Sequence, residues 1–212
     1  MSESRKPTIR PAKDGPYLVE NLGLLGNVKG PVEAKDKYAL CRCGKSDNKP
    51  FCDGTHKKVG FSSEKLEGRI EDKRENYAGE DIAVHDNRGI CAHAGYCTDG
   101  SPAAFRLKKE PFVDPDGAPA EEIIGTIRKC PSGALSYSVD GQEHRDREGR
   151  PTIFIAPHGP YVVSGGPELL DTERLEGAST EHWTMCRCGG SKNKPFCDGT
   201  HWYNEFRDEK NA

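Results

Sequence analysis

The residues of this chain best suited to chemistry are its cysteines, of which its 212 residues contain nine. They form three groups: Cys41, Cys43 and Cys52; Cys91, Cys97 and Cys130; and Cys186, Cys188 and Cys197. The N-terminal residues lack the apolar stretch of a secretory signal, and an odd number of cysteines argues against a disulfide framework. Closely spaced thiols in a reducing compartment indicate metal binding instead. We therefore expect a cytoplasmic metal-binding protein.

The first and third cysteine groups lie in two copies of one motif. Residues 41–56 read CRCGKSDNKPFCDGTH and residues 186–201 read CRCGGSKNKPFCDGTH, so 14 of 16 positions are identical. The likeness continues upstream, where the segments 15–19 and 159–163 also correspond. The chain therefore carries a duplicated module on either side of a different segment. We place the domains at 1–76 (the first module), 77–142 (the insert) and 143–212 (the second module).

Each module combines three cysteines with one histidine, His56 in the first and His201 in the second. Three thiolates and one imidazole form a complete tetrahedral ligand set for a single zinc ion. The same four donors can instead act as two pairs, one for each metal of a two-iron cluster. The spacing of the residues leaves both possibilities open.

The two motifs resemble the CDGSH iron–sulfur family, also called NEET proteins, with Thr55 and Thr200 in place of the serine. The resemblance implies a 2Fe–2S cluster in each module and a twofold pairing of the modules. It also implies which donors share an iron: Cys41 with Cys43, Cys52 with His56, Cys186 with Cys188, and Cys197 with His201.

Such a ligand set has a consequence for the redox potential. An oxidised two-iron core bound by three thiolates and a neutral imidazole is less negative than one bound by four thiolates. Adding an electron is then easier, so we expect potentials above those of all-cysteine ferredoxins. This property suits an electron carrier, a redox or pH sensor, or a donor of clusters.

The insert carries the remaining cysteines, Cys91, Cys97 and Cys130, the last followed directly by Pro131. Residues 77–140 resemble the divergent single-cluster ferredoxins, but Ala94 stands where those have their middle cysteine. Three thiolates suffice for a 3Fe–4S cluster, which we expect here. A 4Fe–4S cluster is the alternative and would need a fourth ligand, for which His93 is the nearest candidate. Zinc, or no cluster, is a third possibility.

Other residues of the duplicated motif have simpler interpretations. Ser46 and Ser191 could bond to cluster sulfurs or to the loop backbone. Asp53 and Asp198 stand where a helix N-cap would lie. We expect the loop lysines to be solvated: Lys45, Lys49, Lys192 and Lys194.

The pattern of elements predicts a β-rich α+β protein. Short strands are expected at 17–19, 38–40, 161–163 and 182–185, and a helix at 118–128. Each module has little apolar material and exposes strand edges. We therefore expect the modules to pair within one chain as a pseudo-dimer, a β-cap with cluster-binding loops. The α+β ferredoxin-like insert would form a separate lobe, and the protein would be a monomer.

The functional prediction follows from these sites. The net charge of −3 argues against a nucleic-acid partner, and no apolar run is long enough for a membrane. No nucleotide-binding or hydrolase motif occurs, so we predict no enzymatic activity. We expect a multi-cluster electron-transfer protein that meets a redox partner protein. The alternative is a cluster carrier or sensor that meets an apo-protein acceptor.

Overall fold

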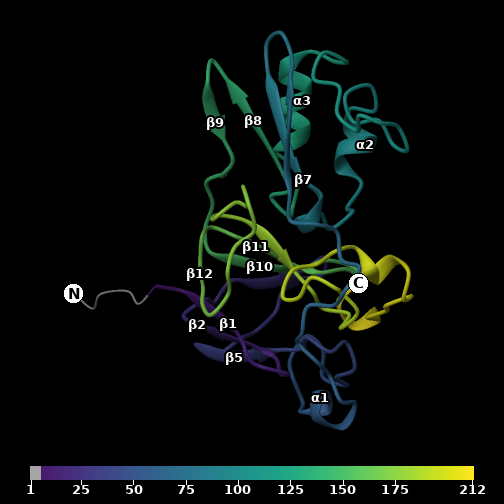
Figure 1. Cartoon of the computed structure of the whole chain (residues 1–212). Helices are drawn as coiled ribbons and strands as arrows, with labels where there is room; N and C mark the ends of the chain where they lie inside the picture. Colours follow the sequence, from purple (N-terminus) through teal and green to yellow (C-terminus); the bar gives the residue numbers. More distant parts are fainter. Residues whose placement is uncertain (1–5) are drawn as a thin grey trace, which may run out of the picture.

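The structure is a computed structural model that describes residues 6–212 and is mostly β with few helices. Residues 1–5, the start of the predicted first domain, lie outside the described residues. Two sheets are built by the modules and a third by the insert (Figure 1). No helix in the described range is long and apolar enough to cross a membrane.

The first sheet has the order β12-β1-β2-β5 and the second has the order β13-β11-β10-β3-β4. The strands of the first are β1 (Thr8–Pro11), β2 (Tyr17–Glu20), β5 (Lys37–Leu40) and β12 (Glu168–Leu169). Those of the second are β3 (Leu25–Asn27), β4 (Gly30–Pro31), β10 (Thr152–Ile155), β11 (Tyr161–Ser164) and β13 (Trp183–Met185). The predicted strands therefore exist, within one residue at each end.

Each module contributes short strands to the sheet of the other: the second module contributes β12, and the first contributes β3 with β4 beside it. Strand β12 of the second module pairs in parallel with β1, placing Ile9 opposite Leu169. Strand β3 of the first module pairs in parallel with β10, placing Ile153 opposite Leu25. The two pairings involve corresponding positions of the repeat, because both residues of each pair differ by 144 from their counterparts. Each module thus covers an edge that the other would leave open.

Two tyrosines join the modules at the centre of the molecule. The rings of Tyr17 and Tyr161 are fully buried and meet edge to face, with centroids 6.1 Å apart. The Tyr17 hydroxyl lies 2.9 Å from the carbonyl oxygens of Cys186 and Pro195. The Tyr161 hydroxyl makes the reciprocal bonds to the first module, to Cys41 at 2.9 Å and Pro50 at 3.1 Å. Each tyrosine therefore supports the cysteine loop of the opposite module.

Tyr17→Phe is expected to lower the free energy of unfolding by about 1–3 kcal/mol, because it removes two buried hydrogen bonds. Thermal unfolding followed by circular dichroism measures the loss. Tyr38→Phe is the matched control, since the Tyr38 hydroxyl makes one partly buried bond, to Leu22 of its own module. Equal losses in the two variants would contradict a special role for the bonds between modules.

The insert forms a four-stranded sheet in the order β6-β7-β8-β9, covered by α3 (Figure 1). Its strands are β6 (Arg74–Ala78), β7 (Ala83–Asn87), β8 (Leu135–Val139) and β9 (Gln142–His144). The predicted boundaries at 76 and 142 fall within β6 and β9. Its helices are α2 (Tyr96–Gly100), the 3-10 turn Arg88–Ile90, and α3 (Ala120–Ile127).

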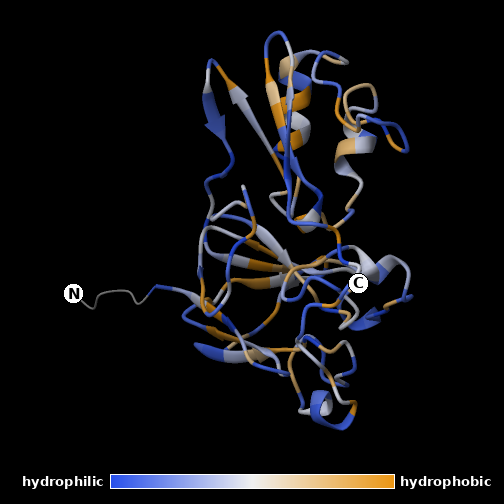
Figure 2. Ribbon diagram, viewed as in Figure 1, coloured by the Kyte–Doolittle hydropathy of each residue, from blue (hydrophilic) through white to orange (hydrophobic). Residues whose placement is uncertain are grey.

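Helix α3 is two residues shorter at its start and one at its end than the predicted 118–128, and Pro119 is its N-cap. Its apolar spacing predicts a buried stripe of Ile123, Ile124 and Ile127, of which Ile123 and Ile127 are buried and Ile124 is only partly buried. In the modules, the helical turns are α1 (Thr55–Lys58), Thr200–Trp202 and Glu209–Asn211. Hydrophobic residues gather along β10, β11 and part of α3, whereas α1 and β9 are hydrophilic (Figure 2).

The insert is not the separate lobe expected from the sequence. Buried residues of both modules and of the insert belong to one continuous apolar core. The Asn193 side chain of the second module donates a 2.6 Å hydrogen bond to the carbonyl of Gly89. The Asn87 side chain of the insert also donates a 2.9 Å bond to the carbonyl of Glu176 in the second module. These non-local contacts dock the insert on the second module.

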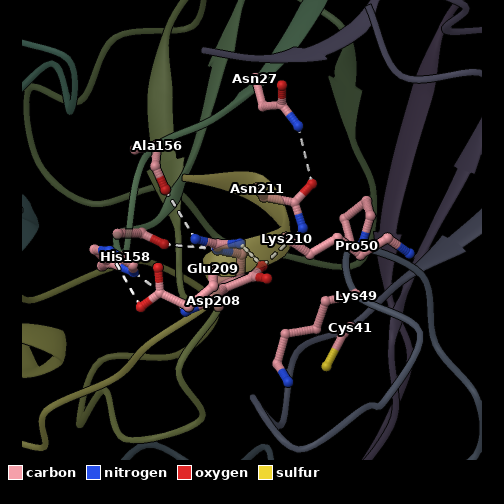
Figure 3. Close-up of polar contacts among 12 residues, drawn as sticks. Asn27, Cys41, Lys49, Pro50, Ala156, His158, Asp208, Glu209, Lys210 and Asn211 are labelled. Atoms are coloured by element: carbon pink, nitrogen blue, oxygen red, sulfur yellow. Dashed lines mark hydrogen bonds and ion pairs between the residues drawn. The ribbon is translucent and has the colours of Figure 1, made fainter. Parts of the chain in front are cut away.

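The end of the chain ties the modules together through a buried polar network. The Arg187 guanidinium pairs with the Asp208 carboxylate, and both side chains are almost fully buried. Asn211 donates a 2.8 Å bond to Asp208 and accepts a 3.1 Å bond from Asn27 of the first module. Figure 3 shows Asn27, Asn211 and Asp208 in this chain of contacts.

Candidate metal centres

The cysteines and histidine of the first module lie as two pairs. The Cys41 and Cys43 sulfurs are 3.9 Å apart, and the Cys52 sulfur is 3.3 Å from Nδ1 of His56. Strand β5 ends at Leu40, where backbone bonds from Cys41 to Pro50 and from Cys52 to Ala39 place the pairs side by side. The second module repeats this arrangement, at 4.0 Å for Cys186 with Cys188 and 3.4 Å for Cys197 with His201.

These separations suit one metal ion per pair. Two donors on one tetrahedral metal with bonds of about 2.0–2.3 Å lie about 3.5–3.8 Å apart. Within residues 6–212, no three His, Cys, Asp or Glu side chains form a group around one metal position. The donors of each module therefore lie as two pairs, and the residues present fit a group that contains two metals.

The two cysteine loops touch each other through glycines. Gly44 and Gly189 both have positive φ, +75° and +80°. A Cβ on Gly44 would lie 2.6 Å from the carbonyl oxygen of Cys188, and a Cβ on Gly189 would lie 2.5 Å from that of Cys43. Only glycine allows this close approach, so the geometry of each site depends on the other module.

The three cysteines of the insert line one cavity of about 280 Å³. His93 lines the same cavity and has φ of +53°, and its backbone N–H donates a 3.4 Å bond to the Cys91 sulfur. Burial raises the pKa of Cys91 to about 12, so its thiol stays protonated until a metal binds. The cavity and its three thiols fit a cluster larger than a single ion.

Comparison with known protein families agrees with these three sites. Residues 14–57 and 158–202 both match the family described as iron-binding zinc finger, CDGSH type. Residues 77–140 match the family described as divergent 4Fe-4S mono-cluster. The chain belongs to the CDGSH-type iron-binding family, with a mono-cluster domain between its two CDGSH domains. It is therefore an iron–sulfur protein.

Two curated relatives match part of this CDGSH protein. The uncharacterized protein YjdI of Escherichia coli strain K12 is 43% identical over 61 residues, which cover 29% of this chain and 80% of YjdI. The protein of the same name from Escherichia coli O157:H7 matches to the same extent. No solved structure matches the chain.

The serines of the CDGSH loops bond to the backbone, which decides between the two predicted roles. Ser46 donates a 2.7 Å bond to the carbonyl of Phe51 and accepts a 3.0 Å bond from the N–H of Asn48. Ser191 makes the same 2.7 Å bond, to Phe196. The serines therefore hold the loop that carries the third cysteine.

The sequence predicts that the aspartates of the CDGSH loops are helix N-caps, and this prediction is wrong. The N-caps are Gly54 and Gly199, which have no side-chain cap. Asp53 instead accepts bonds from two backbone N–H groups, of Thr55 at 3.0 Å and of Asp47 at 2.8 Å. Asp198 bonds in the same way, so each carboxylate braces the loop around the histidine.

One loop lysine is buried, against expectation. Lys194 is 5% exposed, and its ammonium donates a 2.6 Å bond to the Ser191 carbonyl. It lies under the Phe61 ring of the first module, 5.9 Å from the ring centroid. Its counterpart Lys49 is half-buried, whereas the other loop lysines, Lys45 and Lys192, are exposed as predicted.

Each Cys-x-Cys pair is prepared to bind a metal. The hydrogen bond from Cys41 lowers the pKa of Cys43 to about 6. The bond from Cys186 likewise lowers the pKa of Cys188 to about 6. Within each pair, one sulfur is therefore a thiolate at neutral pH, which is the form that ligates metals.

The sequence did not point to several further residues that line the insert cavity. Trp202 and Tyr203 of the second module line that cavity, as do Asp86 and Arg88 of the insert. For Trp202 and Tyr203, the sequence held one indication of a different role: the two modules diverge at these positions, where the first module has Lys57 and Lys58.

Asp86→Asn is expected to stabilise the protein increasingly as the pH rises. Burial raises the pKa of Asp86 to about 7, with Arg88 3.8 Å away opposing the shift. The folded state then binds more protons than the unfolded state between about pH 4 and pH 7, so wild-type stability falls across this range. The advantage of the variant should grow by about 2–3 kcal/mol between pH 5 and pH 8. Thermal unfolding at both pH values measures it, and a constant difference would contradict the prediction.

Proposed function

We propose that this protein transfers electrons through a 2Fe–2S cluster in each CDGSH module and a third cluster in the insert. The observation that best supports this proposal is the arrangement of the donors of each module as two pairs. The two donors of a pair lie 3.9 and 3.3 Å apart in the first module and 4.0 and 3.4 Å apart in the second. Two adjacent pairs favour a two-iron cluster over the single zinc ion that the sequence left open.

The chain's own residues would stabilise the charge of a bound cluster. When bound, such a cluster accepts and returns one electron. The N–H of Gly190 lies 3.4 Å from the Cys188 sulfur, and that of Gly199 lies 3.5 Å from the Cys197 sulfur. Donors to ligand sulfurs favour the more negative, reduced state and so raise the potential.

The modules would act as a pseudo-dimer within one chain, and the protein as a monomer. This part of the proposal is supported by the reciprocal pairing of β12 with β1 and of β3 with β10. The reciprocal bonds of Tyr17 and Tyr161 support it as well. A second copy of the chain would find these pairing positions already occupied by the tethered module.

The cluster of the insert is proposed to be 3Fe–4S, held by Cys91, Cys97 and Cys130. The three thiols line the cavity and suffice for this cluster, and one edge of the His93 ring, which lines the same cavity, packs against Gly199 of the second module. The description of the matched family favours the alternative, a 4Fe–4S cluster with a fourth ligand.

Iron analysis and electron paramagnetic resonance test both parts of this proposal. Protein purified without oxygen should contain about seven iron atoms per chain. In the oxidised form only the insert should give an S = 1/2 signal, because oxidised 2Fe–2S clusters are silent. About eight iron atoms with no signal would replace 3Fe–4S by 4Fe–4S. One zinc per module, without sulfide, would overturn the 2Fe–2S assignment.

Cluster donation is the second candidate function. It is favoured by the partial exposure of Cys52 and His56 in the first module, because a ligand pair that water reaches can release its metal. Incubation with an apo-ferredoxin tests it: donation transfers the cluster, whereas an electron carrier is reduced and reoxidised with its iron content unchanged.

A further inference from the structure

The two CDGSH sites differ in the exposure of their Cys-His pairs. In the second module Cys197 is 2% exposed and His201 is 5% exposed. In the first module, Cys52 and His56 are only half-buried. Since 14 of the 16 motif residues are identical, the cause lies in what surrounds each site.

The insert covers the second site. The His93 ring packs on Gly199, where a Cβ would lie 2.7 Å from the ring. The Trp202 indole donates a 3.2 Å bond to the His93 carbonyl, and its ring packs against His201 with centroids 5.1 Å apart. At the corresponding Gly54 of the first module, a Cβ would meet no atom of residues 6–212 within 4 Å beyond its chain neighbours.

The adjoining loop is covered in the same unequal way. Asn193 is buried and donates a bond to Gly89 of the insert, whereas its counterpart Asn48 is exposed. The segment before the insert also crosses this loop, where the N–H of Leu66 donates a 2.9 Å bond to the carbonyl of Lys192.

Around the open site, exposed lysines stand at three positions where the covered site has uncharged residues, whereas the covered site has the exposed Lys192 where the open site has Asp47. Lys45, Lys57 and Lys58 are exposed around the first site. The residues at these positions of the second module are Gly190, Trp202 and Tyr203. Two exposed acids lie in the same loop: Asp47, and Asp53, whose carboxylate is bonded to backbone N–H groups. The lysines leave a cationic rim, which favours an anionic surface on a partner.

We infer that the first CDGSH site is where the chain exchanges electrons with an acidic protein partner, while the second is an internal site sealed by the insert. This inference rests on the proposed function. One electron would pass between the partner's redox group and the group held at Cys52 and His56, and the side that gains it is reduced as the other is oxidised. The second site would exchange electrons only inside the molecule, next to the insert.

Iron release tests the seal on the second site. Cys52→Ser leaves the second site as the intact CDGSH site, and Cys197→Ser leaves the first. After reduction with dithionite at pH 7.5, an anionic ferrozine-type chelator should remove iron from the first site at least about tenfold faster. Equal rates in the two variants would overturn the seal.

Variants of residues that contact the insert test whether the insert is what protects the second site. In the Cys52→Ser protein, Asn193→Ala or Trp202→Lys should speed the release about tenfold. In the Cys197→Ser protein, the matched control Asn48→Ala should change it by less than about twofold. Unchanged release in both insert-contact variants would show that the insert does not seal the site.

The rate of electron exchange tests the docking face, with an acidic plant-type 2Fe–2S ferredoxin as the probe. Lys57→Glu with Lys58→Glu should slow oxidation of the reduced ferredoxin at least about tenfold and weaken its salt dependence. Lys192→Glu, an exposed lysine of the second module, is the control and should leave the rate unchanged. An equal loss in both would overturn the docking face. Absence of 2Fe–2S absorption in both single-site proteins would instead reject the proposed function.

Discussion

Gly44→Ala is expected to remove most of the iron from both CDGSH sites while the insert keeps its own. The new Cβ would meet the Cys188 carbonyl oxygen at 2.6 Å, and a φ of +75° is itself unfavourable for alanine. Because Gly44 touches the opposite loop, the displacement should reach both ligand sets. Iron content and the visible spectrum of the purified variant measure the loss.

Gly54→Ala is the matched control for this prediction. Its φ is also positive, at +89°, but a Cβ there meets no neighbour within the described residues. It should therefore cost only the strain of the backbone, about 1–2 kcal/mol, and keep its clusters. If both variants lose iron equally, backbone strain and not the contact between loops is the cause.

Asp208→Ala is expected to lower the free energy of unfolding by about 3–5 kcal/mol, because it leaves the Arg187 guanidinium buried without its counter-ion. It also removes the acceptor for Asn211, which links the chain end to Asn27. The midpoint of thermal unfolding, followed by circular dichroism, measures the effect.

Two further variants test whether the loss of stability comes from the unpaired charge or from the loss of side-chain packing. Adding Arg187→Met to Asp208→Ala should recover most of the stability, since no buried charge then remains unpaired. Ser63→Ala, at the corresponding position of the first module, removes only the exposed hydrogen bonds of the Ser63 hydroxyl with Asp14 and should cost less than about 1 kcal/mol. A double variant as unstable as Asp208→Ala would show that packing and not charge is decisive.

The sequence was most informative where the structure is local. Each ligand set lies within sixteen residues, so the motif predicts the side chains that come together. Two of the short strands were predicted from the Gly-Pro turns before them and two from their position ahead of the cysteine loops, and α3 was predicted from the spacing of Ile123, Ile124 and Ile127. The spacing alone left zinc and an iron–sulfur group both possible. The family resemblance, confirmed by the matches to residues 14–57, 77–140 and 158–202, indicated iron–sulfur binding.

The contacts between distant segments could not be predicted. The position of Lys194 under Phe61 and the docking of Asn193 on Gly89 depend on the final placement of whole domains. No periodicity within either segment encodes such a contact. The one available signal was the divergence of the repeat at Trp202, where a large aromatic side chain replaces a lysine.

The exchange of strands between the modules has a consequence for how the chain folds during its synthesis. Strand β1 is made well before its partner β12, which follows about 160 residues later in the chain. Until then the first sheet keeps an unpaired edge, and Gly44 has no opposite loop to meet. The sheet of the insert, whose strands all lie between residues 74 and 144, can close before the second module exists. The order of synthesis therefore favours a folded insert first and a completed pair of CDGSH modules last.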